Sequence, residues 1–274
     1  MRIAKMIRIL RARLFVSATL VAAVVVAATA AGAQSLGRRI ADAPDGKVRL
    51  EFAARPDVCG HGTYISRGRN STMNWDSDRS ADVEYTEDCY QSPVRLVFEK
   101  RGGQVDKIRT YVGGRWRAPV GTVTDLGKVS TREATDYLLA LASTSSARPA
   151  REAIFPLTLA DSVAVWPGLL RLARDQSRPN EIRTQSVFWL SQIAGEAITA
   201  NLAALTGDAA VDRDVREQAV FALSQRPKDE GVPALIQIAR TNRDPEIRKK
   251  ALFWLGQSRD PRALALFEEI LSRR

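Results

Sequence analysis

Apolar and polar residues alternate along the chain after residue 45. Val48, Leu50 and Phe52 are separated by charged residues, which gives the two-residue period of a strand with one apolar face. A second alternating stretch, 94–112, is interrupted by Gly102 and its neighbouring glycine, which permit the positive φ angles of a tight hairpin turn. These patterns predict a small β-rich module over residues 34–128, with a polar surface loop over 67–81.

The hydrophobic period changes near Lys128. Ser130 and Glu133 form an S-x-x-E capping box, and apolar residues then recur at helical spacing. A connection rich in Ser, Ala and Arg follows over 143–151 before the helical pattern resumes. The fold class we predict is α+β in two modules, with a helical module over 129–274.

The helical module repeats itself at offsets of 33 and 32 residues. An acid, a β-branched residue and an arginine recur at 181–183, 214–216 and 246–248, and each triplet leads into a motif such as QSVFWLSQ. A second register with the same offsets runs through the intervening helices, which predicts stacked helix pairs. It consists of Leu169, Leu202, Leu235 and Phe267, and of Leu172, Leu205, Ile238 and Ile270.

Two further rows follow from the repeat. The aromatic row lies outside the main apolar stripe of each second helix, which makes sense if the adjacent repeat covers it. The arginine row lies in the first turn of a helix, where the dipole disfavours a cation, so each arginine is expected to pair with an acid of its own or the next repeat. The rows are Phe188, Phe221 and Phe253, and Arg183, Arg216 and Arg248.

The repeated motif resembles bacterial HEAT-like repeats of the short type, similar to those named after phycobilin lyases. The resemblance covers Ala164 to Leu271 and implies an α–α solenoid whose surface holds another molecule. Family members range from lyase subunits to scaffolds, so the resemblance alone allows a lyase-like enzyme as an alternative. Two departures are a first helix that looks reduced, at 201–206, and tryptophans at 189 and 254 where a small residue is usual.

Polar residues recur on the second helices as candidate partner contacts. The side-chain amides nearest the helix ends can have one of two roles. They either donate to backbone carbonyls of the following turn, or they form a row that binds a ligand. The first residues of the three motifs lie within about 20° of that row on the helical projection. The candidate partner-binding residues are Gln185, Gln192, Gln218, Gln225, Lys250 and Gln257.

Residues 1–33 have the pattern of a secretory signal peptide. A basic stretch without acids precedes an apolar run from Leu14, and Ala31-Gly32-Ala33 is an A-x-A cleavage site. The alternative is an uncleaved helix that anchors the protein in the inner membrane, because the run is long enough to span a bilayer. Either way we expect the folded part outside the cytoplasm, in the periplasm or secreted. The basic residues are Arg2, Lys5, Arg8, Arg11 and Arg13.

Removal of this segment changes the charge. Its five cations reduce Lys+Arg from 41 to 36 against 31 acids, so the net charge falls from +10 to +5. That excess is ordinary for solubility, and nucleic acid is not expected as a partner outside the cytoplasm.

Two cysteines, Cys59 and Cys89, remain in a compartment that favours oxidation, so a disulfide is predicted between them. The alternative is a metal or small-ligand site in which Cys59, His61 and Cys89 supply three zinc ligands, although no fourth ligand and no paired C-x-x-C spacing is present.

Catalytic motifs are scarce. His61 is the only histidine, and the chain has no G-x-S-x-G, H-E-x-x-H, P-loop or G-x-G-x-x-G motif. We therefore expect no enzyme and no cofactor, and predict an exported binding or scaffolding protein that holds a protein or peptide.

Overall fold

The computed structural model describes residues 35–62, 64–67, 71–74, 82–84, 88–91, 93–144, 147–193 and 195–272. The chain divides into two compact units, 1–42 and 43–274. Of the first unit, helix α2 (Leu36–Asp42) is described, and the signal segment predicted over 1–33 lies outside the described residues. All contacts below lie within the second unit.

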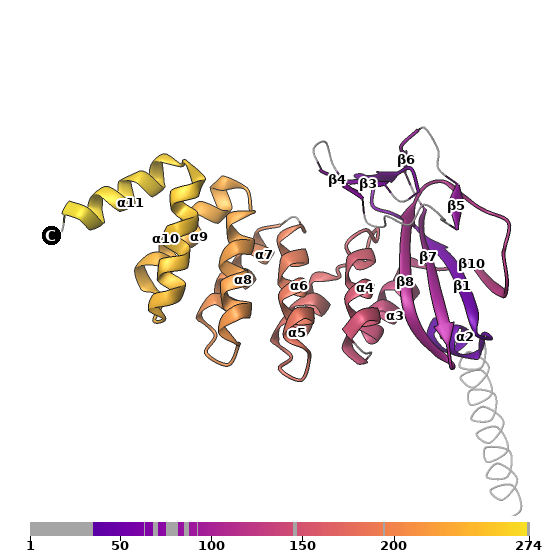
Figure 1. Cartoon of the computed structure of the whole chain (residues 1–274). Helices are drawn as coiled ribbons and strands as arrows, with labels where there is room; N and C mark the ends of the chain where they lie inside the picture. The colour runs from indigo at the N-terminus through magenta and orange to yellow at the C-terminus, as the bar shows by residue number, and fades with distance from the viewer. Residues whose placement is uncertain are drawn as a thin grey trace, which may run out of the picture. The chain divides into compact units, whose positions relative to one another are not determined.

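A four-stranded sheet in the order β10-β1-β7-β8 forms the larger part of the β-rich module (Figure 1). Strand β1 pairs with β7 antiparallel, with Leu50 opposite Leu96, and with β10 parallel. The predicted hairpin is present, and Gly102 and Gly103 have φ of 59° and 76° at its turn. The strands are β1 (Gly46–Phe52), β7 (Val94–Arg101), β8 (Gln104–Val112) and β10 (Val123–Lys128).

The apolar face of this sheet packs against the start of the helical region. Val48, Leu50 and Phe52 are fully buried, as the alternation predicts. The ring of Phe98 meets that of Tyr137 edge-on at 5.5 Å, and the Ile108 amide donates to a carboxylate oxygen of Glu152 at 2.6 Å. The sheet therefore covers the first helix pair of the solenoid.

The structure contains a second sheet, in the order β4-β3-β2-β6. Because of this sheet, the prediction of a surface loop over 67–81 is wrong in part. Residues 71–74 form strand β4, which pairs with β3 so that Ser71 lies opposite Arg67. Antiparallel pairing uses main-chain groups, so a polar sequence can form it without an apolar face. Residues 68–70 and 75–81 of that prediction lie outside the described residues. The small strands are β2 (Val58–Gly60), β3 (Tyr64–Arg67), β4 (Ser71–Asn74), β5 (Val83–Glu84), β6 (Tyr90–Gln91) and β9 (Arg115–Trp116).

The helical region begins with the predicted capping box. The Glu133 carboxylate accepts from the Ser130 amide at 3.1 Å, and the Ser130 hydroxyl oxygen accepts from the Glu133 amide at 3.2 Å. The connection predicted over 143–151 is wrong at both ends, because the preceding helix extends to Thr144 and helix α4 begins at Ala147. Alanine and arginine are strong helix formers, so this composition favours a helix more than a linker.

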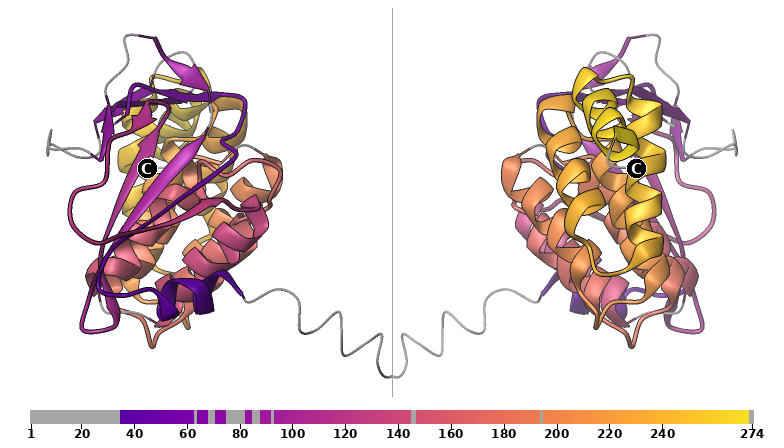
Figure 2. Two further views of the ribbon diagram at one scale, coloured as in Figure 1. Left: turned by 90° about the vertical axis from the view of Figure 1, so that its right-hand side faces the viewer. Right: turned by 90° about the vertical axis from the view of Figure 1, so that its left-hand side faces the viewer.

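Helices pair in succession, and the second helices α4, α6, α8 and α10 pack side by side in a row (Figures 1 and 2). The prediction of a reduced helix over 201–206 is wrong, because α7 runs from Glu196 to Gly207. The α+β two-module fold is confirmed. The helices are α3 (Thr131–Thr144), α4 (Ala147–Leu157), α5 (Trp166–Arg174), α6 (Asn180–Ser191), α7 (Glu196–Gly207), α8 (Arg213–Ser224), α9 (Lys228–Thr241), α10 (Pro245–Ser258) and α11 (Pro261–Ser272).

Candidate functional site

The first two arginines of the arginine row each link one repeat to the next. Arg183 forms an ion pair with Asp212, and Nη1 of Arg216 lies 3.0 Å from Oδ2 of Asp244. Both acids occupy the N-cap position of the next second helix. Arg248, the last of the row, donates to the carbonyls of Asn242 and Arg243 at 2.8 and 3.2 Å instead.

The acid in the second link is held in its charged form. Burial alone would raise the pKa of Asp244, but a hydrogen bond from the Glu246 amide and the positive charges of Arg213 and Arg216 lower that pKa below its ordinary value. The Asp244 carboxylate is therefore ionised at near-neutral pH.

The aromatic row also reaches from one repeat to the next. The Phe221 ring lies 5.1 Å from the ring of Trp254, and the Phe155 ring lies 4.9 Å from that of Trp189 in the same relation two repeats earlier. Phe188 and Phe221 are half-buried, whereas Phe253 is 55% exposed. Phe155 follows the same offset of 33 residues, so the stack extends back to α3 and α4, before the start of the resemblance at Ala164.

Two of the candidate amides near the helix ends donate to the hydroxyl of the preceding serine. Nε2 of Gln192 donates to the Ser191 hydroxyl at 2.9 Å, and Nε2 of Gln225 donates to the Ser224 hydroxyl at 3.1 Å. Gln225 and Gln257 are exposed. The row thus has amide atoms at the surface at its C-terminal end.

The other three candidates are less accessible. Gln185, Gln218 and Lys250 are half-buried. Nζ of Lys250 lies 2.9 Å from a carboxylate oxygen of Glu217 on the neighbouring second helix, so this lysine takes part in a link between repeats.

A depression between the ends of α8 and α10 brings two of the candidates together. Gln225, Trp254 and Gln257 line it with apolar residues of α9, and its volume is about 170 Å³. The indole Nε1 of Trp254 is buried and has no hydrogen-bond partner among the described residues. The exposed side-chain amides of Gln225 and Gln257 can donate to a carbonyl or carboxylate oxygen at this depression.

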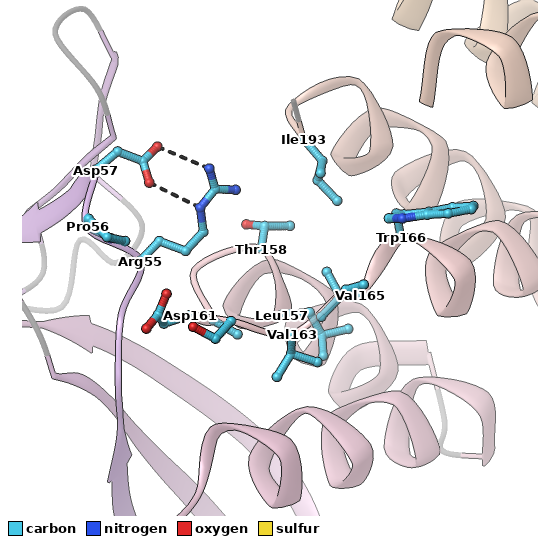
Figure 3. A pocket seen from close by; sticks show the side chains of 13 residues that line it. Arg55, Pro56, Asp57, Leu157, Thr158, Asp161, Val163, Val165, Trp166 and Ile193 are labelled. Carbon is cyan, nitrogen blue, oxygen red and sulfur yellow. Dashed lines mark hydrogen bonds and ion pairs between the residues drawn. The ribbon is translucent and has the colours of Figure 1, made fainter. Parts of the chain in front are cut away.

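A larger cavity of about 640 Å³ lies where the β-rich module meets the solenoid, and sequence reasoning missed it (Figure 3). Arg55 pairs with Asp57 on one side, while Trp166 and Ile193 lie on the other. Volumes of this size are typical of ligand pockets, and an apolar floor with a few polar groups suits a small ligand or a peptide side chain.

Hydrogen bonds between two backbone segments hold the walls of this cavity in place, and neither segment contains a recognised motif. The Arg55 amide donates to the Leu159 carbonyl at 2.9 Å, and the Asp161 amide donates to the Ala53 carbonyl at 3.1 Å. Neither segment repeats, and neither has a recognisable spacing, so no signal in the sequence brings them together.

Cys59 and Cys89 form the predicted disulfide, with their Cα atoms 5.3 Å apart. The two sulfur atoms are bonded to one another, so neither cysteine is a free thiolate. In this oxidised form they cannot bind zinc together with His61, as the alternative prediction requires. Over the described residues, no group of three or more potential ligands has a metal-binding arrangement.

These contacts define a helical repeat protein of the α–α solenoid class, preceded by a strand-rich module. Residues 198–274 match a family model of HEAT repeats, so the predicted HEAT-like repeats of the C-terminal half are confirmed. No curated protein matches the chain. In the part of the chain that the structure describes, each helix is too short or too polar to span a bilayer.

Proposed function

We propose that this chain is an exported binding or scaffolding protein of the cell envelope, in which the solenoid holds a protein or peptide partner. HEAT repeats are commonly used for protein interactions, and the match over 198–274 supports this role. The disulfide supports an oxidising compartment, either the periplasm or the exterior. The segment 1–33 remains our proposed signal peptide, with an inner-membrane anchor as the alternative.

The depression between α8 and α10 is the observation that carries the proposal. The exposed amides of Gln225 and Gln257 line it beside the indole ring of Trp254. Each amide can donate to a carbonyl oxygen that a partner supplies. An extended peptide has such oxygens at regular intervals, so it fits this row better than a compact ligand does.

The test is a triple substitution, Gln192→Ala with Gln225→Ala and Gln257→Ala, in the full chain. We expect weaker capture of the partner that co-purifies from the envelope fraction, with an almost unchanged unfolding midpoint. The control is Gln104→Ala with Gln237→Ala, which removes exposed amides from β8 and from the first-helix row. Capture that survives the triple substitution would place the binding surface elsewhere.

The cavity beside Arg55 and Asp57 supports a second candidate function, which is binding of a small ligand by the β-rich module and the solenoid together. Its volume and its apolar floor are the specific observations. Trp166 lines it and is half-buried, so a ligand should change tryptophan fluorescence. A Trp166→Phe variant that keeps the full fluorescence change on ligand addition would exclude this cavity as the binding place.

A further inference from the structure

The cavity beside Arg55 and Asp57 is lined by more acids than bases. Its charged lining residues, among those that the structure describes, are Arg55, Asp57 and Asp161. Arg55 is already engaged, because its Nε and Nη2 atoms lie 3.1 and 3.4 Å from the two carboxylate oxygens of Asp57. Over the described residues, the side chain of Asp161 has no ion pair and no hydrogen bond. One negative charge at the cavity is therefore left for a ligand.

The backbone on both sides of Asp161 is constrained. Ala160 pairs with Ala54 in a β-bridge, and the Asp161 amide donates to the Ala53 carbonyl at 3.1 Å. Ser162 has a φ of 55°, a left-handed conformation that costs free energy for any residue with a Cβ. Such a conformation persists only where the surrounding contacts impose it, and it is frequent at ligand sites. The Asp161 carboxylate is thus held at the cavity by a segment with little freedom to move.

The start of helix α5 also lines the cavity, but its amides do not make an anion site. A helix N-terminus attracts anions through amide groups that have no partner within the helix. Here Pro167 has no amide hydrogen, and the amides of Gly168 and Leu169 donate to the Val165 carbonyl at 3.1 and 3.2 Å. Three of the first four residues of this helix therefore offer no amide to a ligand, and the excess carboxylate decides the charge preference.

Figure 3 shows Asp161 and the ring of Trp166 on opposite sides of the cavity, with Leu157 and Val163 between them. We propose that the cavity binds an organic cation, with an ammonium group against the Asp161 carboxylate and an apolar stem that extends along Val163 towards Trp166. A hydrogen bond between two charged groups is stronger than one between neutral groups, and the stem leaves water for an apolar surface. This inference rests on the second candidate function and names the class of ligand.

The ammonium group can belong to a free amine or to a lysine side chain of a peptide. A lysine side chain has the same two parts, a compact positive charge and an apolar stem. Both sources therefore satisfy Asp161 and the apolar lining in the same way, and the probes below separate them.

The test uses three probes with the same apolar stem: hexylamine, hexanol and hexanoate. At neutral pH we expect hexylamine to bind the full chain about tenfold more tightly than hexanol, as gain of a charged hydrogen bond does, and hexanoate to bind most weakly. Binding is followed by the change in tryptophan fluorescence, and Trp166→Phe should remove most of that change.

A lysine-containing tripeptide, blocked at both ends, is titrated in the same way. Tighter binding of the tripeptide than of hexylamine would support the proposal with a peptide as the source of the cation. The reverse order would support it with a free amine as the source.

Asp161→Asn removes the charge of the side chain and keeps its shape. It should weaken hexylamine binding about tenfold and leave hexanol binding unchanged. Asp57→Asn is a second variant, outside the constrained segment at 160–162. It leaves Arg55 without its acid, so hexanoate should bind more tightly and hexylamine more weakly. The control is Asp136→Asn, at an exposed position of α3 outside the cavity lining, and it should change none of the three affinities.

Equal losses of hexylamine and hexanol binding in Asp161→Asn would overturn the proposal, because the aspartate would then shape the cavity without attracting charge. Equal binding of all three probes by the wild type would also overturn it, while the cavity would remain a ligand site. If none of the probes binds, both this inference and the second candidate function fail.

Discussion

The guanidinium of Arg226 donates a hydrogen bond to the carbonyl of Ile193 at 2.5 Å, across 33 residues of sequence. The same group donates to the carbonyls of Ser191 and Gly195, and its side chain is only 3% exposed. It therefore binds carbonyls at the C-terminal end of helix α6 and in the connection from α6 to α7. Glu230 completes the site, with Oε2 lying 2.7 Å from Nη2 of Arg226.

Arg226→Ala should be among the most destabilising single substitutions in the solenoid. It leaves the Glu230 carboxylate and several carbonyls without their donor, which in buried pairs costs about 3 to 5 kcal/mol. Arg226→Lys should recover only a small part, because an ammonium cannot match the fork of a guanidinium. Urea unfolding of both variants checks this, with Arg240→Lys as a control at an exposed pair. A lysine variant as stable as the wild type would contradict the geometric role.

The disulfide between Cys59 and Cys89 should stabilise the β-rich module. The two cysteines are 30 residues apart, and closure of a loop of this length is worth about 3 to 4 kcal/mol in the chain-entropy model. We expect the double variant Cys59→Ser with Cys89→Ser to unfold at lower denaturant than the oxidised chain. Mass spectrometry after alkylation without reduction should find neither cysteine modified. Two alkylated cysteines in the exported protein would show that the bond does not form there.

The repeat was predictable from sequence because its contacts recur at a fixed offset. Arg216 meets Asp244 and Phe221 meets Trp254 at separations near one repeat length, so the pattern in the chain mirrors the pattern in space. The capping box at Ser130 was predictable because its two residues bond across one helical turn.

Other features left no such signal. The cavity beside Arg55 depends on main-chain pairing between residues near 54 and 160, which any side chains could accompany. Strand β4 is polar, and α4 has Pro156 where α6 has Trp189, so neither matched the expected pattern.

Acid should weaken the junction between α10 and α11 through Asp260. Hydrogen bonds from the side chain and the amide of Arg262 lower the pKa of Asp260 to about 2, from an ordinary 3.8. A carboxyl with a depressed folded pKa contributes stability above its unfolded pKa, and this contribution is lost as pH falls from about 3.8 towards 2. The stability difference between wild type and Asp260→Asn should therefore shrink over that range. Glu268→Gln on α11 is the control, and an equal shrinkage in it would contradict the assignment.

Phe221 and Phe253 occupy the same position in successive repeats, so they allow a matched test of stacking. Phe221 is half-buried, and its ring lies 5.1 Å from that of Trp254 in the next repeat. Phe221→Ala should cost about 3 kcal/mol, as removal of a packed aromatic ring does. Phe253 is 55% exposed and meets only the neighbouring Trp254 in a described ring contact, so Phe253→Ala should cost less than about 1 kcal/mol. Thermal and urea unfolding of the two variants measure the difference. Equal losses would mean that the next repeat does not cover Phe221, and the stacking of the aromatic row between repeats would be wrong.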